Sequence, residues 1–401
     1  MTDIAVIGGG PAGLMAAERL AQAGCRVSIY DRMPSLGRKL LMAGRGGLNL
    51  THSEPFDIFL TRYSTPAPQL EAALRAFPPE ALRTWAAGLG EETFAGSSGR
   101  VFPKSFKASP LLRALLRRLE ALGVRVHTRH AWTGFSENGV VFATPQGERE
   151  VRADAVVLAL GGASWPRLGA DGGWTKILTA KGVPVTPLAP SNCGVRIDWS
   201  ETFRSRFSGT PLKRIAVEAF ALEVAGELVV TDYGLEGGAL YALTPVLRDA
   251  LSTGETGLAI DLRPDLDEAG IVQRLSHPRR GATLTNFLRK ALKLSPIQTG
   301  LLRESGGREL PTDPAALARL IKHVQLKVTG LQGLERAIST AGGIPFAAVT
   351  DDFELQSLPG VFVAGEMLDW EAPTGGYLLQ ASFATGIAAA AGVLARSGAG
   401  G

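Results

Sequence analysis

The chain has 401 residues, of which 45% are hydrophobic and 20% are charged, and its formal net charge is +4. These proportions exclude an intrinsically disordered chain and are ordinary for a globular protein, while the length favours two domains. The two cysteines, Cys25 and Cys193, lie far apart in sequence, and the five histidines lack metal-ligand spacing. Neither a dithiol redox centre nor a metal site is therefore indicated.

Membrane attachment and export are not expected either. The sequence contains no run of 18 uninterrupted apolar residues and no signal peptide, and its N-terminus leads directly into the first expected strand. We therefore expect a cytoplasmic protein that does not contact a membrane.

The first 23 residues have the pattern of a dinucleotide-binding unit. Residues 3–7 are expected to form a buried strand, Gly8-x-Gly10-x-x-Gly13 a tight turn, and residues 14–23 an alanine-rich helix. The first glycine permits the turn, the second lets the backbone approach a pyrophosphate, and the third lets helix and strand pack closely. Pro11 and Ala12 lie within this turn and are expected to bind the cofactor, because the N-terminus of the helix that follows favours an anion. A glycine-rich turn in an ordinary α/β protein is the alternative.

A second expected strand, residues 26–30, supports this interpretation. It ends at Asp31, about where an acid binds a ribose hydroxyl in this kind of unit, and Arg32 follows directly. We therefore assign Asp31 and Arg32 to cofactor binding.

The next segment, residues 37–53, combines several glycines with the cations Arg38, Lys39 and Arg45. Such a composition is poorly suited to a core and well suited to a loop that faces a ligand. Arg38, Lys39 and Gly44 are accordingly expected to bind the cofactor.

Helices and strands are expected to alternate up to residue 182. Helical patterns cover residues 69–76, 79–88, 110–122 and 171–182, and the short strands 124–128, 139–143 and 150–152 resemble a small β-meander. A buried strand, residues 155–160, ends in Gly161 and Gly162. Ligands collect outside the carboxyl ends of strands in open α/β sheets, so this glycine pair is expected near the cofactor.

The character of the chain changes after prolines 184, 187 and 190. Strand patterns at 195–197, 214–223, 227–230 and 258–262 indicate a β-rich insert, and residues 267–327 have a helical, basic pattern. Residues 263–327 contain 12 Lys or Arg and 6 Asp or Glu, a local charge of +6, which leaves −2 for the remainder of the chain. This lobe either attracts a polyanion such as nucleic acid or presents an ordinary solvated face.

The C-terminal segment again has the pattern of a strand, a glycine-rich turn and a helix, as at the N-terminus. A short strand, residues 360–364, runs into Gly365 and Glu366, and Gly375, Gly376 and Tyr377 precede an alanine-rich helix over residues 378–394. We expect all five of these residues to contribute to the cofactor site.

Together these patterns predict an α/β protein whose cofactor domain is split. Its parts are residues 1–189 and 336–401, and residues 190–335 form the insert with the basic helical lobe at 263–327. Three strand ends would converge on one extended ligand, which fits FAD, with the ADP half on the first unit and the flavin near the last helix. That helix would direct its positive end at the flavin, and Glu366 would hold a ribityl hydroxyl.

A set of motifs spread over nearly the whole chain resembles one family of bacterial flavoproteins. These motifs are Gly8–Gly13, Gly37-Arg38-Lys39-Leu40-Leu41, Asn49-x-Thr51, Gly226-Glu227-x-x-x-Thr231-x-x-Gly234-Leu235, Thr340-Ala341-Gly342-Gly343-Ile344, Ala364-Gly365-Glu366-x-x-Asp369 and Thr374-Gly375-Gly376-Tyr377. The combination is similar to the BaiN/YhiN-type NAD(P)/FAD-dependent oxidoreductases. Many members read Gly-Gly-Gly-Arg-Cys-Asn where this chain reads Gly44-Arg45-Gly46-Gly47-Leu48-Asn49, which indicates a separate subfamily.

The resemblance implies a Rossmann-like, two-dinucleotide-binding-type FAD domain with a β-barrel-like insert and a small helical lobe. It also implies reduction of electron-poor C=C bonds, either in steroid-like enones or in a uracil ring of ribosomal RNA. Hydride would pass from reduced flavin N5 to the substrate, with NAD(P)H as the possible donor. Since no second GxGxxG follows a strand in the insert, NAD(P)H would dock transiently, and an oxidase that uses oxygen is also open.

Arg45, Asn49 and His52 are the candidate catalytic residues in the loop after Lys39. Arg45 could stabilise an enolate-like oxygen, and the ordinary pKa of histidine would suit His52 as the acid. The alternative is that these residues hold the flavin and its loop in place. Tyr377 is a further possible proton donor.

Three classes of function therefore remain open. The first is a small-molecule FAD reductase or oxidase. The second is an RNA-modifying flavoenzyme whose basic lobe contacts phosphates through Arg279, Arg280, Arg289, Lys290 and Lys293. The third is a flavin-binding sensor without turnover.

Overall fold

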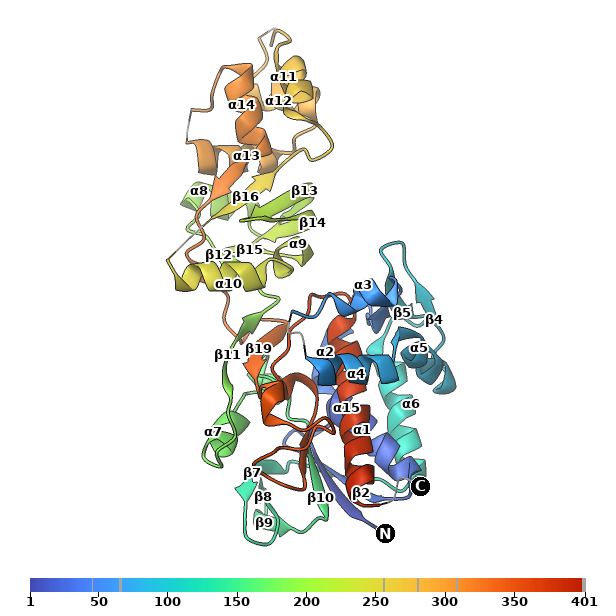
Figure 1. Cartoon of the computed structure of the whole chain (residues 1–401). Helices are drawn as coiled ribbons and strands as arrows, with labels where there is room; N and C mark the ends of the chain where they lie inside the picture. The colour runs from blue at the N-terminus through green and yellow to red at the C-terminus, as the bar shows by residue number, and fades with distance from the viewer. Residues whose placement is uncertain (45, 65–66, 255–256, 280, 308, 399–401) are drawn as a thin grey trace. The chain divides into compact units, whose positions relative to one another are not determined.

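The chain divides into two compact units, each with its own core. The computed structural model describes residues 1–44, 46–64, 67–254, 257–279, 281–307 and 309–398. Unit 1 comprises Met1–Ala189 and Ile338–Gly401, and unit 2 comprises Pro190–Ala337 (Figure 1). Unit 1 is thus built from both ends of the chain.

A five-stranded parallel sheet forms the centre of unit 1, and the α/β prediction is confirmed. In spatial order its strands are β20 (Val361–Val363), β10 (Ala155–Leu158), β1 (Asp3–Ile7), β2 (Arg26–Asp31) and β6 (Arg125–Thr128). Strand β10 and residues 4–7 of β1 are apolar and buried without interruption, as in a parallel sheet that is covered on both faces. Only the edge strand β6 exposes an apolar side chain, Val126.

Strand β6 corrects one expectation. Residues 124–128 were expected in the β-meander, but β6 pairs in parallel with β2, from Ser28↔Arg125 to Asp31↔Thr128. The preceding helix α6 (Ala108–Ala121) returns the chain to the sheet edge, as a parallel crossover requires. The meander consists of the next three strands, β7 (Ala131–Phe135), β8 (Val140–Thr144) and β9 (Gly147–Val151).

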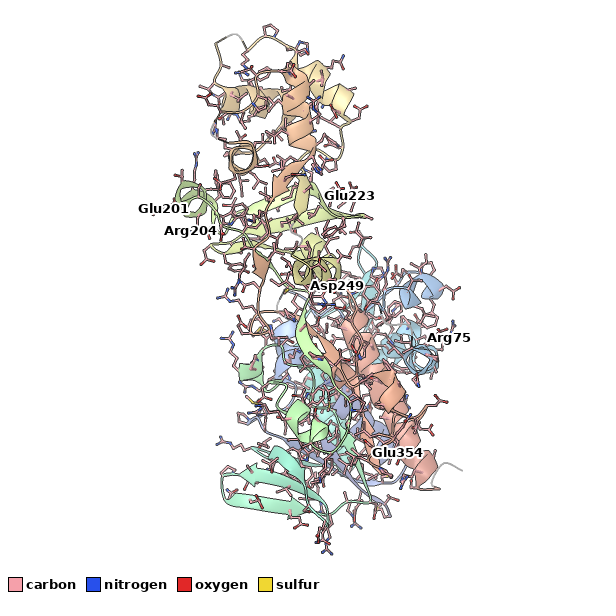
Figure 2. All side chains as sticks on the ribbon, turned by 60° about the vertical axis from the view of Figure 1, so that its left-hand side comes forward. Arg75, Glu201, Arg204, Glu223, Asp249 and Glu354 are labelled. Atoms are coloured by element: carbon pink, nitrogen blue, oxygen red, sulfur yellow. The ribbon has the colours of Figure 1, made fainter. Side chains whose placement is uncertain are left out.

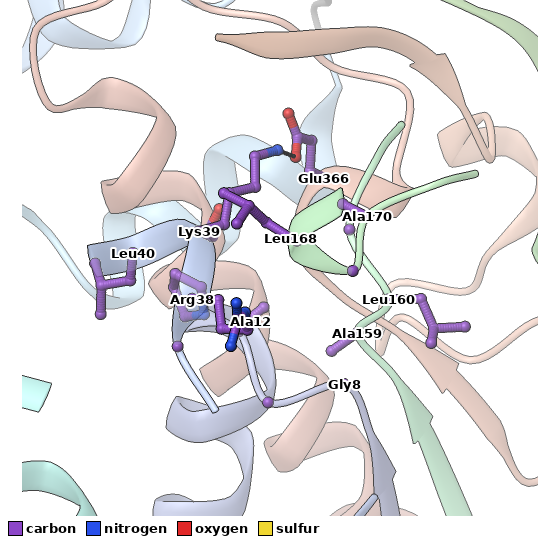
Figure 3. A pocket seen from close by; sticks show the side chains of 18 of the residues that line it. Gly8, Ala12, Arg38, Lys39, Leu40, Ala159, Leu160, Leu168, Ala170 and Glu366 are labelled. Carbon is purple, nitrogen blue, oxygen red and sulfur yellow. Dashed lines mark hydrogen bonds and ion pairs between the residues drawn. The ribbon is translucent and has the colours of Figure 1, made fainter. Parts of the chain in front are cut away.

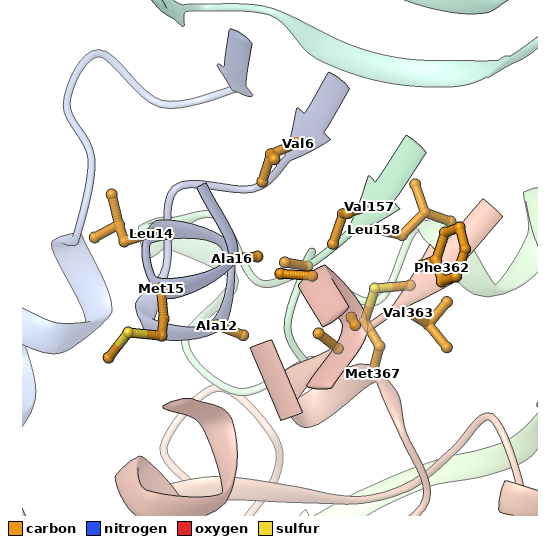
Figure 4. Packing of buried hydrophobic residues seen from close by; sticks show 14 of the residues in the cluster. Val6, Ala12, Leu14, Met15, Ala16, Val157, Leu158, Phe362, Val363 and Met367 are labelled. Atoms are coloured by element: carbon orange, nitrogen blue, oxygen red, sulfur yellow. The ribbon is translucent and has the colours of Figure 1, made fainter. Parts of the chain in front are cut away.

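Two helices from opposite ends of the chain pack together beside this sheet. They are α1 (Pro11–Gln22) and α15 (Tyr377–Arg396), and Figure 4 shows Ala12 and Ala16 on the side of α1 toward Val157 of the sheet, and Leu14 and Met15 on its other side. A Cβ on Gly386 of α15 would lie 2.4 Å from the backbone oxygen of Ala12, so only glycine permits this approach.

Helix α15 is also long and apolar enough to suit a membrane span. However, 56% of its most apolar window is buried inside the protein, as is usual for a core helix.

The remaining elements of unit 1 are short. Its other helices are α2 (Arg38–Ala43), α3 (Phe56–Leu60), α4 (Pro68–Ala76), α5 (Pro79–Gly88) and α7 (Trp174–Thr179), with 3₁₀ turns η1 (Pro166–Leu168), η2 (Phe346–Ala348) and η3 (Gly365–Met367). Strands β3 (Thr51–His52), β5 (Arg100–Pro103) and β4 (Thr93–Ala95) form an antiparallel sheet in that order, and β11 (Thr186–Ser191) pairs with β19 (Ser339–Gly343).

Unit 2 contains a seven-stranded antiparallel sheet and seven helices among its described residues. In spatial order the strands are β17 (Val324–Leu326), β16 (Leu258–Asp261), β13 (Pro211–Ala219), β14 (Leu222–Val230), β15 (Gly234–Glu236), β12 (Val195–Arg196) and β18 (Gly330–Leu331). The helices are α8 (Glu201–Phe207), α9 (Gly238–Tyr241), α10 (Thr244–Ser252), α11 (Glu268–Leu275), α12 (Leu284–Leu292), α13 (Pro296–Gly306) and α14 (Pro314–Lys322).

Two expectations about the insert are wrong. Its sheet is open within the described residues, because β17 and β18 each pair on one side only, so the expected barrel-like closure is absent. The expected strand over 214–223 also runs through a turn, since β13 ends at Ala219 and β14 begins at Leu222. Phe220 occupies that turn with φ 58°, and nothing in its side chain predicts such a conformation.

Charged side chains cover the outside of both units. Arg75 on α4 of unit 1 and Glu201 and Asp249 of unit 2 are exposed, and Figure 2 labels them.

We predict that the contact between α1 and α15 limits the stability of unit 1. Gly386→Val should lower the free energy of unfolding by about 1–3 kcal/mol, because its side chain must displace the Ala12 backbone. Ala391→Val adds the same side chain at an exposed position of α15 and should cost about 0.5 kcal/mol or less. Urea denaturation measures both variants, and equal losses would contradict this role for Gly386.

Candidate functional site

A cavity of about 900 Å³ lies at the carboxyl edge of the parallel sheet in unit 1. It is lined by the segment that follows each of the five strands: 8–12 after β1, 31–33 after β2, 130–133 after β6, 159–161 after β10 and 364–366 after β20. Because the strands lie side by side, the cavity extends along the whole sheet edge. It thus suits an elongated ligand.

The glycine turn lies at the middle of this edge, and its three glycines act differently. A Cβ on Gly8, which has φ +110°, would lie 2.2 Å from the Ala159 oxygen, and a Cβ on Gly13 would lie 1.9 Å from the Gly8 oxygen. These two glycines allow close backbone packing, and Gly13 does not line the cavity. A Cβ on Gly10 would meet no atom within 4 Å. Only Gly10 therefore leaves open space beside the cavity.

Helix α1 begins at this turn with an uncapped N-terminus. Gly10 is its N-cap and no side chain accepts from its first turn, while Pro11 and Ala12 line the cavity. The free backbone N–H groups and the positive end of the helix favour an anionic group here.

The end of β2 provides the acid expected from the sequence. Asp31 lines the cavity and accepts hydrogen bonds from the backbone N–H of Gly9 at 2.8 Å and of Met33 at 2.7 Å. Burial raises the pKa of Asp31 above its ordinary 3.8, although these hydrogen bonds oppose that effect. The neighbouring Arg32 forms an ion pair with Asp171, and both line the cavity.

Helix α2 contributes two cations with different surroundings. Lys39 Nζ donates to Glu366 Oε2 at 2.6 Å (Figure 3). It also donates to Ser164 Oγ at 2.6 Å. Arg38 also lines the cavity, and its buried Nε has no hydrogen-bond partner among the described residues. Arg38 is therefore the cation of α2 that remains available to a ligand.

Glu366 is engaged on both oxygens. Besides Lys39, its carboxylate accepts from the backbone N–H of Thr340 at 2.9 Å and of Gly162 at 3.3 Å. These bonds join η3, α2, β19 and the loop after β10 into one wall. Gly161 and Gly365 line the cavity with Glu366, but Gly162 does not, because its Cα faces the Thr340 side chain.

Helix α15 begins beside the same cavity. Gly375 has φ +138° and Gly376 has φ +99°, and a Cβ on Gly376 would lie 2.5 Å from the Thr51 backbone. Glycine is therefore required at position 376, where the start of α15 lies against the backbone of β3. Both glycines and Leu378 line the cavity, and no side chain caps the helix. A second positive helix end thus lies beside the ligand space.

The structure does not bring His52 into the cavity lining. Its Nε2 lies 2.9 Å from the Ser98 oxygen, its Nδ1 accepts from the Glu54 backbone N–H at 3.2 Å, and its ring stacks on Tyr377 with centroids 5.4 Å apart. Both ring nitrogens are thus engaged by backbone groups, and the role of His52 as the catalytic acid stays a prediction.

Tyr377 lies in the same network and is also absent from the cavity lining. Its hydroxyl donates to Glu54 Oε1 at 2.6 Å, and its backbone oxygen accepts from the Tyr63 hydroxyl at 2.9 Å. Burial and the Glu54 carboxylate raise the pKa of Tyr377 well above its ordinary value. The side chain thus holds the start of α15 through Glu54, and its role as a proton donor stays a prediction.

The remaining predicted residues divide as follows. Asn49 lines the cavity, and its buried Oδ1 has no partner among the described residues. Gly44 does not line it, because its Cα packs against Ala108 of α6. Arg45 lies outside the described residues.

Sequence reasoning missed Arg100 and the aromatic walls of the cavity. Arg100 of β5 lines it, as do four of the six tryptophans, namely Trp132, Trp165, Trp174 and Trp370. Trp132 Nε1 is buried with no partner among the described residues. No sequence motif identifies Arg100. The tryptophans, however, lie beside glycine-rich loops, and this position could have indicated that they line the cavity.

Comparison with known proteins supports this description. The model of the HI0933-like protein Rossmann domain matches residues 2–392. A 3-dehydro-bile acid delta(4,6)-reductase of Clostridium scindens is 26% identical over 96% of this chain and 97% of its own. A ribosomal RNA dihydrouridine synthase of Haemophilus influenzae is 24% identical over 96% of both chains, and one of Escherichia coli is 25% identical over 98% of both.

Solved structures share the fold at low sequence identity. A 3-ketosteroid delta1-dehydrogenase from Sterolibacterium denitrificans matches with a TM-score of 0.55 and 13% identity over 98% of this chain and 99% of that one. A flavocytochrome c3 fumarate reductase matches with a TM-score of 0.50 and 15% identity over 99% and 78%.

We predict that Glu54 stabilises the start of α15 in a pH-dependent way. Burial alone would raise the pKa of Glu54, but hydrogen bonds from Arg62 and Tyr377 and the Arg62 charge hold it below its ordinary 4.5. A lowered pKa gives stability that is present above about pH 4.5 and is lost as the pH falls further. Glu54→Gln should therefore cost about 1–2 kcal/mol at pH 7 and less at pH 3.5.

Urea denaturation at the two pH values measures this difference. Glu71→Gln removes an exposed carboxylate paired with Arg75 and should cost about 0.5 kcal/mol or less at either pH. A loss for Glu54→Gln that does not change with pH would be evidence against the role of its charge.

Proposed function

The chain belongs to the HI0933-like family of flavin-dependent oxidoreductases, and we propose that it binds FAD along the sheet-edge cavity and reduces an electron-poor C=C bond. One observation carries the proposal: a single elongated cavity lies beside two uncapped helix N-termini and the ends of all five parallel strands. The relatives that act on a bile acid and on ribosomal RNA support a reductive reaction at a conjugated double bond.

The residues of the cavity fit FAD. Open space beside Gly10 would admit the pyrophosphate, and the unpartnered Arg38 Nε offers it a donor. Asp31 would bind the ribose of the ADP half. The unpartnered Asn49 Oδ1 and the start of α15 would face the ring system at the other end.

When bound, FAD supplies hydride to the β-carbon of the acceptor. The chain itself would position the acceptor, exclude water and stabilise charge. Tryptophan side chains provide apolar walls, and the positive end of α15 would stabilise negative charge that develops nearby. The ion pair of Lys39 and Glu366 would keep this wall rigid without adding net charge. NADH or NADPH is the proposed reductant.

A second candidate, an RNA base as the acceptor, is favoured by the basic lobe of unit 2. Arg289, Lys290 and Lys293 are exposed on and after α12 and form no ion pair with any described residue. By contrast, Arg263 and Lys322 of the same lobe pair with aspartates. Arg279 stacks on Phe287, and Arg280 lies outside the described residues. Free cations on one helix end suit phosphate contacts.

We predict that Gly10→Val removes FAD without unfolding the protein. The φ of Gly10 is −85° and a Cβ meets no atom within 4 Å, so the fold admits valine, whose side chain then occupies the pyrophosphate space. Flavin absorbance per protein should fall about tenfold or more, with thermal unfolding of the apoprotein unchanged. Gly238→Val, also into open space, is the control and should retain flavin. A fully yellow Gly10→Val protein would overturn the pyrophosphate assignment.

The reaction itself is tested by anaerobic mixing of the loaded protein with NADH or NADPH. We expect the flavin absorbance to bleach and a Δ4-3-ketosteroid to restore it. Restoration by ribosomal RNA alone, with binding that weakens as salt rises, would favour the second candidate. Restoration by oxygen alone would indicate an oxidase, and the absence of bleaching with either nucleotide would refute the proposed donor.

A further inference from the structure

Tyr377 is the first residue of α15, and hydrogen bonds hold both its side chain and its backbone. Its hydroxyl donates to Glu54 Oε1 at 2.6 Å, and its backbone oxygen accepts from the Tyr63 hydroxyl at 2.9 Å. These two partners lie 323 and 314 residues earlier in the chain. Arg62 pairs with Glu54 in turn, and we call Glu54, Arg62 and Tyr63 the clamp.

The clamp fixes the orientation of Tyr377. Arg62 donates to both oxygens of Glu54, from Nε at 3.1 Å and from Nη2 at 2.7 Å, so the carboxylate is held in place and its charge is neutralised. Tyr377 is buried, and its ring packs on His52 and Phe59 with centroids 5.4 and 4.9 Å away. Apolar packing alone would hold α15 against the protein. The directed hydrogen bonds also set the position of its first residue.

The two neighbours of Tyr377 in the sequence, Gly376 and Leu378, line the cavity, although Tyr377 does not. No side chain caps α15, so the N–H groups of its first turn carry a positive partial charge that no side chain offsets. The effect of a helix end on a nearby charge falls off within about one turn. The placement of this first turn therefore decides how strongly it acts on a charge in the cavity.

We propose that the clamp positions the first turn of α15 so that its positive end stabilises the reduced form of bound FAD, which makes Tyr377 a positioning residue for the reduction. The inference rests on the proposed binding of FAD and names what sets the redox potential of the flavin. Reduced flavin carries negative charge on its pyrimidine edge, whereas the oxidised ring is neutral. A helix N-terminus held at that edge binds the reduced form more tightly and so raises the potential.

Redox titration of the FAD-loaded protein against a reference dye tests the inference. Tyr377→Phe and Tyr63→Phe each remove one hydroxyl and keep the aromatic ring. In both variants we expect the midpoint potential to fall by about 15–30 mV, which for a two-electron couple is about a threefold to tenfold loss of affinity for the reduced relative to the oxidised flavin. Flavin content should stay at the wild-type level, because the open space beside Gly10 is unchanged.

Sulfite provides a second measurement that needs no reductant. Its lone pair forms a bond to flavin N5, and the ring electrons that this displaces leave negative charge on the same pyrimidine edge. The dissociation constant of sulfite should therefore rise in both variants by the same factor by which the reduced flavin loses affinity.

Tyr233→Phe is the matched control. It removes a tyrosine hydroxyl that donates to a carboxylate, that of Glu236, in unit 2. Both the midpoint potential and the dissociation constant of sulfite should stay at their wild-type values in this variant.

The outcomes separate the inference from the proposed function. Wild-type protein that binds no FAD would refute the proposed function itself. Bound flavin with an unchanged potential in Tyr377→Phe and Tyr63→Phe would overturn the inference alone, as would an equal shift in Tyr233→Phe. Loss of flavin from both clamp variants would also overturn it, because the clamp would then serve retention of FAD and not its potential.

Discussion

Direct backbone contact at a few glycines is the constraint on which unit 1 depends. Gly8 lies against the end of β10, Gly376 against β3, and Gly386 against the first turn of α1. A Cβ at any of these positions would overlap backbone atoms. Because these contacts join the first and last helices of the chain, they bring two positive helix ends to one cavity. The ligand site is therefore a consequence of close packing.

The ion pairs and hydrogen bonds distinguish charged residues that hold the fold together from polar groups that remain available to a ligand. Lys39 and Glu366 neutralise each other within the cavity wall. Glu54 pairs with Arg62 and accepts a hydrogen bond from Tyr377, which stabilises the start of α15. Arg38 Nε and Asn49 Oδ1 are buried and have no partner among the described residues. Burying unpaired polar groups is costly, so these are the positions where a ligand compensates the protein.

Much of the fold could be predicted because it depends on local patterns. Buried strands appear as apolar runs, and the glycine turn and the Gly375–Gly376 helix start have characteristic sequences. The prediction of secondary structure failed where segments distant in the sequence decide how a strand pairs or where it turns. Residues 124–128 have the same composition as a meander strand but pair with β2, and the turn at Phe220 lacks the glycine or asparagine that usually marks a positive φ.

The sequence by itself determined the family, the α/β class and the glycine-rich segments that line the cavity after β1, β10 and β20, because glycine spacing and apolar periodicity act over short stretches of chain. Only the tertiary structure decided which side chains reach the cavity. His52 and Tyr377 turn toward each other, whereas Arg100, nearly fifty residues beyond His52, pairs with it across a sheet and lines the cavity. The contacts of these side chains come from segments that are distant in the sequence, and only the folded chain brings those segments together.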